Sequence, residues 1–176
     1  IKSHYPSHPL CLCTNGFLLN DKIQELFRLG IRVISITING IDPEIVRILQ
    51  PCIDLGDVAL MGRTAATKLI EAQMSGLRMA VAAGIFVKVN TVLVEGINDG
   101  HMRVLARSLA EAGAGIMNIM PVASPHSRSR LIPPHKEKVE DLRWECEAYL
   151  PQFKLCRQCR SDSAGIPGQI RKGGCL

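Results

Sequence analysis

Short apolar runs alternate along this chain with longer segments in which apolar residues recur at helical spacing. The clearest run, residues 31–38, is almost entirely β-branched and ends at Asn39 and Gly40, which is typical of a buried strand. Three further runs predict strands over residues 10–14, 85–93 and 116–120. Because helices separate the four strands and no hairpin signal is visible, we expect parallel neighbours in chain order, joined by right-handed crossovers.

Helical spacing predicts five helices between and after these strands. They cover residues 21–29, 43–49, 62–82, 98–113 and 133–149. Asn20 and Asn98 stand where N-cap residues are expected, and Gly76 marks a point where the third helix could kink. Residues 51–61, which hold Cys52, are interpreted as a loop. The expected fold class is therefore α/β, with helices on the outer face of one parallel sheet.

Composition favours a single domain with an aliphatic core. Of the 176 residues, 47% are hydrophobic but only 4% are aromatic, which suits helices packed on a buried parallel sheet. After Pro151 the chain turns irregular. No apolar run approaches the roughly 18 residues that a membrane span needs, so we expect no membrane association.

Charge and cysteine content limit the binding partners and the cellular compartment that we expect. The net charge of +5 comes from basic residues that aromatic residues do not accompany, which favours a solvated surface over a nucleic-acid site. Seven cysteines without an obvious disulfide framework indicate the reducing cytoplasm. The chain begins abruptly at Ile1, without Met, so we expect it to be a piece of a longer protein.

Polar side chains gather where the predicted strands end, and sites in parallel α/β folds lie at the carboxyl ends of the strands. The residues expected there are Thr14, Asn15, Thr37, Asn39, Lys88, Asn90, Asn118 and Met120. Asn and Thr also end strands and cap helices, which is the alternative interpretation of this set. Lys88 fits that alternative poorly, because a charged residue in a buried strand needs a partner or an anionic ligand.

Cysteine pairs near both ends of the chain point to metal chemistry. Cys156 and Cys159 form C-x-x-C on an irregular segment, a spacing that lets both thiolates bind one metal ion or one cluster. A redox dithiol or half of a structural zinc site would have the same spacing. Cys11 and Cys13 share one face of a predicted strand, where each could face a site or fill the core. Cys146 lies on the apolar stripe of the last helix and is interpreted as core.

Five ordered motifs together resemble the second half of a barrel of the radical S-adenosylmethionine (SAM) superfamily. They are LCLCTNG, ITIN, KVNTV, GIND and NIMP, at residues 10–16, 36–39, 88–92, 96–99 and 118–121. The ending LCRQCRSDSAG, at residues 155–165, is similar to the NifB family of nitrogenase cofactor-assembly proteins. The resemblance runs through almost the whole chain.

What this resemblance implies is strands three to six of a partial (β/α)6 barrel within residues 1–150, followed by a cluster-binding tail over residues 151–176. Proteins of this family are radical SAM cofactor-maturation enzymes of the lyase type. They fuse two four-iron (4Fe-4S) clusters and insert a carbide from the SAM methyl group, which makes the iron–molybdenum cofactor precursor for nitrogen fixation. The implied cofactors are 4Fe-4S clusters and SAM. The implied partners are a cluster donor and other nitrogenase cofactor-assembly proteins.

The resemblance also implies roles for individual residues. Cys11 would ligate one substrate cluster, and Cys156 with Cys159 would ligate the other. The residues implied to line the SAM and cluster cavity are Asn15, Thr37, Asn39, Lys88, Asn90 and Asn118. No catalytic residue is assigned.

The sequence departs from the family's pattern in one important respect. No C-x-x-x-C-x-x-C occurs in it, so the three thiolates that hold the SAM-cleaving cluster are missing and the chain is expected to be inactive alone. Cys13 also stands where a small residue such as Ser is expected. Two alternatives stay open. One is a noncatalytic iron–sulfur or zinc scaffold that uses Cys156 and Cys159, and the other is a different radical SAM enzyme with an auxiliary cluster.

Overall fold

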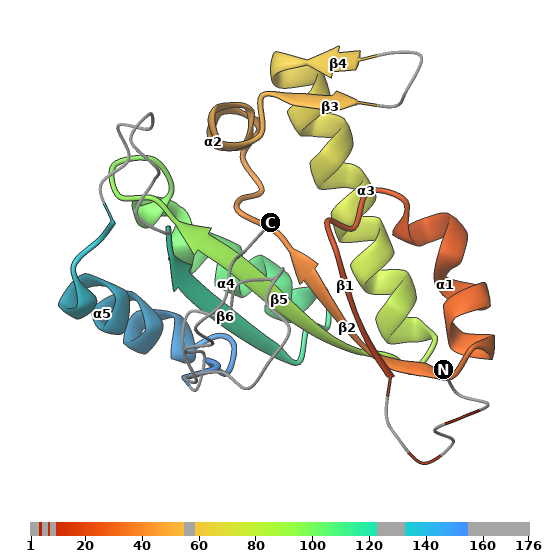
Figure 1. The fold of residues 1–176 in the computed structure, drawn as a ribbon. Helices are drawn as coiled ribbons and strands as arrows, with labels where there is room; N and C mark the ends of the chain where they lie inside the picture. The colour runs from red at the N-terminus through yellow and green to blue at the C-terminus, as the bar shows by residue number, and fades with distance from the viewer. Residues whose placement is uncertain (1–3, 5–6, 8–9, 55–58, 123–132, 155–176) are drawn as a thin grey trace, which may run out of the picture.

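The computed structural model describes His4, Ser7 and residues 10–54, 59–122 and 133–154. Its centre is a four-stranded parallel sheet in the order β1-β2-β5-β6 (Figure 1). The strands are β1 Leu10–Thr14, β2 Ile31–Thr37, β5 Phe86–Leu93 and β6 Ile116–Pro121. The four predicted strands, their direction and their order are confirmed. Each apolar run is long enough to be buried by helices, and crossover connections make neighbouring strands parallel.

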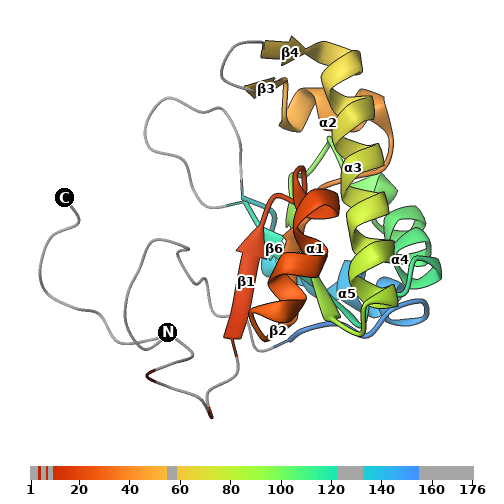
Figure 2. The same cartoon turned by 90° about the vertical axis from the view of Figure 1, so that its right-hand side faces the viewer.

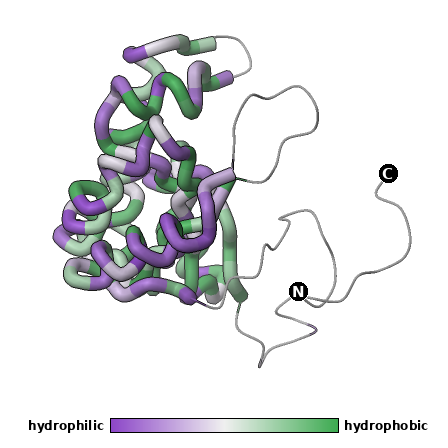
Figure 3. Tube along the Cα trace, turned by 90° about the vertical axis from the view of Figure 1, so that its left-hand side faces the viewer, coloured by the Kyte–Doolittle hydropathy of each residue, from purple (hydrophilic) through white to green (hydrophobic). Residues whose placement is uncertain are grey.

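The helices lie on one side of this sheet (Figure 2). They are α1 Leu19–Arg28, α3 Gly62–Ala82, α4 Met102–Glu111 and α5 Lys136–Glu147, with the short 3-10 turn η1 Asp99–His101 before α4. Hydrophobic and hydrophilic residues interleave along these helices (Figure 3), as expected for helices with one face on a core and one in water.

Residues 51–61 are not the loop that the sequence predicts. After α2, Pro43–Leu49, the strands β3 Cys52–Asp54 and β4 Ala59–Met61 pair with each other in antiparallel fashion. Three-residue strands are too short to show a periodic pattern, which explains why this hairpin was missed. The hairpin and α2 pack near the start of α3 (Figure 1), around a small second core of Val46, Ala66 and Leu69.

Two local expectations about helices are also wrong. The α3 helix continues through Gly76 without interruption. Gly76 instead allows close packing, because a Cβ there would lie 3.0 Å from the Cβ of Leu19 on α1. Asn20 is not an N-cap, since α1 begins one residue before it. Asn98 does stand at the N-cap position of η1, as predicted, but its side-chain oxygen accepts from the Val94 N–H and makes no capping bond.

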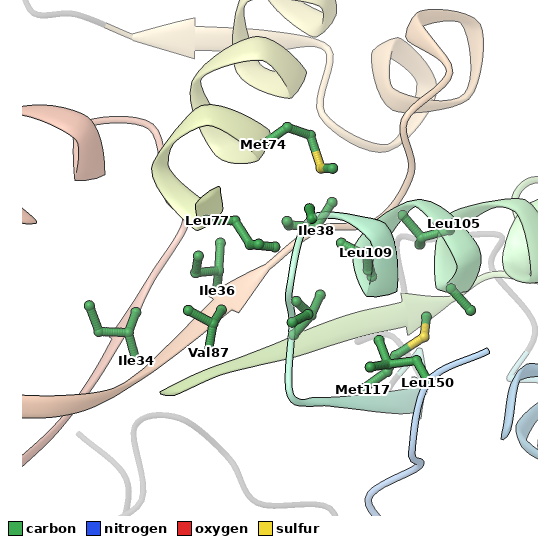
Figure 4. Close-up of a cluster of buried hydrophobic side chains, with 14 of the residues drawn as sticks. Ile34, Ile36, Ile38, Met74, Leu77, Val87, Leu105, Leu109, Met117 and Leu150 are labelled. Carbon is green, nitrogen blue, oxygen red and sulfur yellow. The ribbon is translucent and has the colours of Figure 1, made fainter. Parts of the chain in front are cut away.

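The main core lies between the sheet and the helices, where alternate residues of the inner strands are fully buried (Figure 4). Ile34 and Ile36 of β2, Val87 of β5 and Met117 of β6 point toward α3 and α4. Cys146 of α5 is fully buried with this cluster, as the sequence predicts.

The chain returns to the outer edge of β6 after α5. The Met117 N–H donates to the Pro151 carbonyl at 2.9 Å, and the Phe153 N–H donates to the Met117 carbonyl at 2.7 Å. These bonds form a parallel bridge between Met117 and Gln152. We call residues 151–153 the edge segment. It lies in the part of the chain that the sequence assigns to the tail, and it extends the sheet beyond β6.

Candidate functional site

The face of the sheet that is turned away from α1, α3 and α4, here called the open face, carries most of the predicted site. Side chains alternate between the two faces of a strand, so the strand register fixes which residues share a row across it. Three such rows run through the middle of the sheet: the first row holds Cys11, Val33 and Phe86, the middle row Cys13, Ser35, Lys88 and Ile116, and the last row Thr37, Asn90 and Asn118. The pair Val92 and Met120 lies on the same face beyond these three rows. Polarity therefore increases from the first to the last of these three rows, in the direction of the carboxyl ends of the strands.

The last row contains a buried amide with an unused acceptor. Asn118 is 1% exposed, and its Nδ2 donates to Oδ1 of Asn90 at 3.1 Å. No hydrogen bond reaches Asn118 Oδ1 from the residues that the structure describes. A buried oxygen without a donor costs about 1–3 kcal/mol, so this position is suited to a ligand that donates a hydrogen bond. The donor groups of SAM, its amines and ribose hydroxyls, fit that requirement.

Lys88 places a positive charge on the middle row. Its Nζ lies 3.9 Å from the centroid of the Phe153 ring, and Phe153 belongs to the edge segment. The Lys88 side chain is half-buried on the open face, beside Ser35 in the neighbouring strand. This arrangement keeps an ammonium group available to an anionic ligand, as the sequence suggests for a charged residue in a buried strand.

Two of the predicted site residues use their side chains in structural hydrogen bonds to the backbone. Asn15 Oδ1 accepts from the Phe17 N–H at 3.1 Å, within the turn that leads from β1 into α1. Asn39 Oδ1 accepts from the Val92 N–H at 2.9 Å. These contacts match the alternative interpretation, in which Asn residues complete the ends of strands. Thr37, Lys88, Asn90 and Asn118 are the predicted residues that the structure brings together.

The cysteines fall into two groups. Cys11 and Cys13 are exposed and lie on the same face of β1 as each other, opposite Leu12, as predicted. Cys156 and Cys159 lie outside the described residues. Among the residues with described positions, no group of three or more His, Cys, Asp or Glu side chains is arranged to hold a metal ion. Cys11 and Cys13 would therefore need further ligands to hold a metal centre.

Sequence reasoning did not assign three residues around the site, of which two lie on the open face and one lies on α3. Ser35 lies between Cys13 and Lys88, Phe153 covers Lys88, and Gln73 of α3 ties two strand ends together. The Gln73 Nε2 donates to the carbonyls of Asn15 at 2.7 Å and Thr37 at 2.9 Å. Strand alternation from Thr37 would have placed Ser35 on this face. Nothing in the local sequence signals Gln73 or Phe153, because their contacts are distant along the chain.

His101 is the histidine whose surroundings are clearest. Its Nε2 accepts a hydrogen bond from the Ile41 N–H at 3.2 Å. Burial lowers the pKa of His101, and the negative charge of Asp42 opposes this only in part. The neutral imidazole therefore supports the loop after β2, and His101 is a structural residue in this arrangement.

The parallel sheet with a polar open face at its strand ends is the architecture of a known class. Residues 1–109 match the family model of the Radical SAM superfamily, and the chain belongs to that superfamily. Within it, the chain is similar to curated proteins named FeMo cofactor biosynthesis protein NifB. It is 36% identical over 166 residues to that of Methanocaldococcus jannaschii, a match covering 94% of this chain and 55% of the relative. It is 35% identical over 177 residues to that of Klebsiella pneumoniae, a match covering 97% of this chain and 38% of the relative. It is 36% identical over 173 residues to that of Azotobacter vinelandii, a match covering 94% of this chain and 34% of the relative.

These comparisons confirm the resemblance that the motifs indicate. The chain spans about half or less of the length of the relatives it matches. Two solved structures share its fold. A domain of pyruvate-formate lyase-activating enzyme from Bacteroides vulgatus has a TM-score of 0.61 at 15% identity, covering 85% of this chain and 83% of that one. A radical SAM methyltransferase from Sphaerobacter thermophilus has a TM-score of 0.56 at 18% identity, covering 81% and 39%. At such identities the likeness shows the fold alone.

No helix of the described ranges combines the length and apolar character that crossing a bilayer requires.

Proposed function

We propose that this chain is the C-terminal part of a radical SAM enzyme of nitrogenase cofactor biosynthesis. In the complete protein, two four-iron clusters would be the substrates, and a carbide derived from the SAM methyl group would be inserted as they fuse. Similarity to NifB over 94–97% of the chain supports the pathway. The observation that carries the site is the row of Thr37, Asn90 and Asn118 with its unused buried acceptor.

In this proposal the open face holds SAM and the substrate clusters. Thr37, Asn90 and Asn118 would bind the polar groups of SAM, and Lys88 would balance negative charge. Asn15 and Asn39 would help to form the cavity, chiefly by fixing the loops at the strand ends through their backbone contacts. SAM supplies the methyl group, and this chain's residues supply its orientation.

Cysteine thiolates would hold the iron. Cys11, exposed on the open face, would ligate one substrate cluster, and Cys156 with Cys159 would ligate the other. Phe153 lies on this same face three residues before Cys156, which supports a tail that serves the open face. The 176 residues contain no C-x-x-x-C-x-x-C, so the proposal requires a preceding segment for SAM cleavage, and this chain alone would be inactive.

The same proposal implies a cellular location and partner proteins. The protein would work in the cytoplasm, receive clusters from an iron–sulfur cluster donor, and pass its product to other nitrogenase cofactor-assembly proteins. Thiolate-bound clusters suit the reducing environment that the cysteine content indicates.

The test uses the full-length protein, reconstituted with iron and sulfide without oxygen. We expect Asn118→Leu to weaken SAM binding about tenfold in equilibrium dialysis. The substitution removes the side-chain oxygen that would accept an uncharged hydrogen bond from SAM. The matched control is Asn20→Leu, since Asn20 also has a buried oxygen without a described partner but lies on α1. Unchanged SAM affinity in Asn118→Leu would contradict the site.

The second arm changes Cys156 and Cys159 to Ser together. Bound iron should fall and the eight-iron product should disappear, while reductive SAM cleavage stays largely intact. The control is Cys52→Ser, because Cys52 is exposed on the β3–β4 hairpin. If the double variant keeps its iron and still makes product, the tail assignment is wrong. Zinc in place of iron would favour the alternative of a noncatalytic scaffold.

A further inference from the structure

Phe153 meets Lys88 across a long stretch of intervening chain. The Lys88 Nζ lies 3.9 Å from the centre of the Phe153 ring, within the range at which an ammonium is attracted to the face of an aromatic ring. Both side chains are partly buried. No carboxylate among the described residues forms an ion pair with Lys88. The ring is therefore the group in the described structure that stabilises this charge.

The backbone sets the position of the ring. Phe153 donates its N–H to the Met117 carbonyl at 2.7 Å, and Met117 donates to Pro151 at 2.9 Å. Gln152 lies between these two contacts and is buried. It forms a β-bridge with Met117, whose side chain faces the core. Alternation along the edge segment then directs Phe153 to the opposite face, which is the open face. The ring reaches Lys88 because the edge segment pairs with β6.

We infer that Phe153 is a positioning residue, which holds the Lys88 ammonium toward an anionic group bound on the open face. The inference rests on the proposed function, because the anionic group would be the carboxylate of SAM or the surface of an iron–sulfur cluster. Both carry negative charge, and both would occupy the face where Lys88 lies between the first and last rows. Phe153 acts on either one through Lys88 and touches neither.

The first measurement needs no ligand. In the full-length protein, the rate of Lys88 acetylation by acetic anhydride is followed by mass spectrometry. Phe153→Leu should raise this rate about threefold to tenfold, the range expected when a cation–π contact is lost. Phe153→Tyr, which keeps an aromatic face, should stay near the wild-type rate. Lys68, exposed on α3, is the internal control. Equal Lys88 rates in the wild type and Phe153→Leu would overturn the inference.

The second measurement identifies the anion with a double-mutant cycle. SAM affinity and bound iron are measured after anaerobic reconstitution in the wild type, Lys88→Met, Phe153→Leu and the double variant. If SAM is the ligand, each single change should weaken its binding about threefold to tenfold, and Phe153→Leu should add nothing in the Lys88→Met background. If a cluster is the ligand, iron content should follow this pattern while SAM affinity stays constant.

The cycle also separates failure of the inference from failure of the proposed function. Equal effects of Phe153→Leu with and without Lys88 would show that Phe153 does not act through Lys88, and would overturn the positioning role. A wild-type protein that binds neither SAM nor iron would contradict the proposed function, while the acetylation rates would still decide whether Phe153 positions Lys88. Thermal unfolding of each variant shows whether a loss of binding comes from loss of the fold.

Discussion

Gly16 lies at the turn from β1 into α1, where the backbone has a φ of +82°. A Cβ at this position would lie 2.8 Å from Cγ2 of Ile36 and 3.2 Å from Cγ of Gln73. Gly16→Ala should therefore lower the free energy of unfolding by about 2–4 kcal/mol, through the left-handed backbone and the steric clash together. Urea unfolding of the chain measures this change.

The control for Gly16 is Gly84→Ala. Gly84 has a similar φ of +78°, but a Cβ there would meet nothing within 4 Å. This change should cost only the backbone term of about 1–2 kcal/mol. If the two variants are equally stable, the contact with Ile36 does not contribute and the account of the turn is wrong.

At this same scale, much of the candidate site could be predicted from the sequence. Lys88 and Asn90 alternate with buried valines, so a strand assignment alone places them together on one face. What the sequence could not show is whether a polar side chain is free for a ligand. Asn118 keeps an unused oxygen, whereas Asn39 bonds to Val92, and only the packing of separate strands distinguishes these two residues.

Among the elements, α3 is tied to the ends of two strands by one side chain. Gln73 is 1% exposed, and its amide donates to the carbonyls of Asn15 and Thr37. Gln73→Leu keeps the approximate volume but leaves both carbonyls without that donor, so we expect a loss of about 2–4 kcal/mol in unfolding free energy. Chemical denaturation, with hydrogen exchange at the β1–α1 turn, measures it.

The matched control for Gln73 is Gln24→Leu, because Gln24 is an exposed residue of α1. Its replacement should change stability by less than about 0.5 kcal/mol. A Gln73 variant as stable as this control would show that the two carbonyls find other donors.

The elements also show where prediction from sequence stops. The four parallel strands were predictable because each combines several apolar residues with flanking helices. The β3–β4 hairpin was not, because its strands have three residues each and gain their stability from contact with α3. The bounds of α2 and α3 match the predicted helices, whereas the start of α1 was misplaced because Asn20 resembles an N-cap although α1 begins at Leu19.

For the molecule as a whole, stability should depend on pH through His101. Burial lowers the pKa of His101 in the folded state, so the unfolded chain binds a proton at a higher pH than the folded chain does. The neutral form is favoured by folding, and its contribution is complete above the unfolded pKa of about 6.5. Stability should then fall as the pH drops below that value toward the folded pKa, by at most about 1.4 kcal/mol per pH unit.

Unfolding free energies between pH 5 and pH 8 test this dependence. His101→Gln removes the titration and should flatten the curve in this range, although the variant is less stable overall. His135→Gln is the control, because His135 is exposed. The same slope in the wild type and His101→Gln would assign the pH dependence to other groups.

The edge segment has a consequence for the order of events during synthesis. The N–H and the carbonyl of Met117 both form hydrogen bonds with residues that are synthesised after α5 is complete. The N-terminal part of the chain leaves the ribosome first, so the outer side of β6 stays bare until Pro151 and Phe153 emerge. An unpaired strand edge is a template for pairing with other chains. A ribosome that stalls after β6 has emerged, but before Pro151 and Phe153 have done so, would therefore hold a nascent chain that can pair through β6 with its neighbours on the polysome.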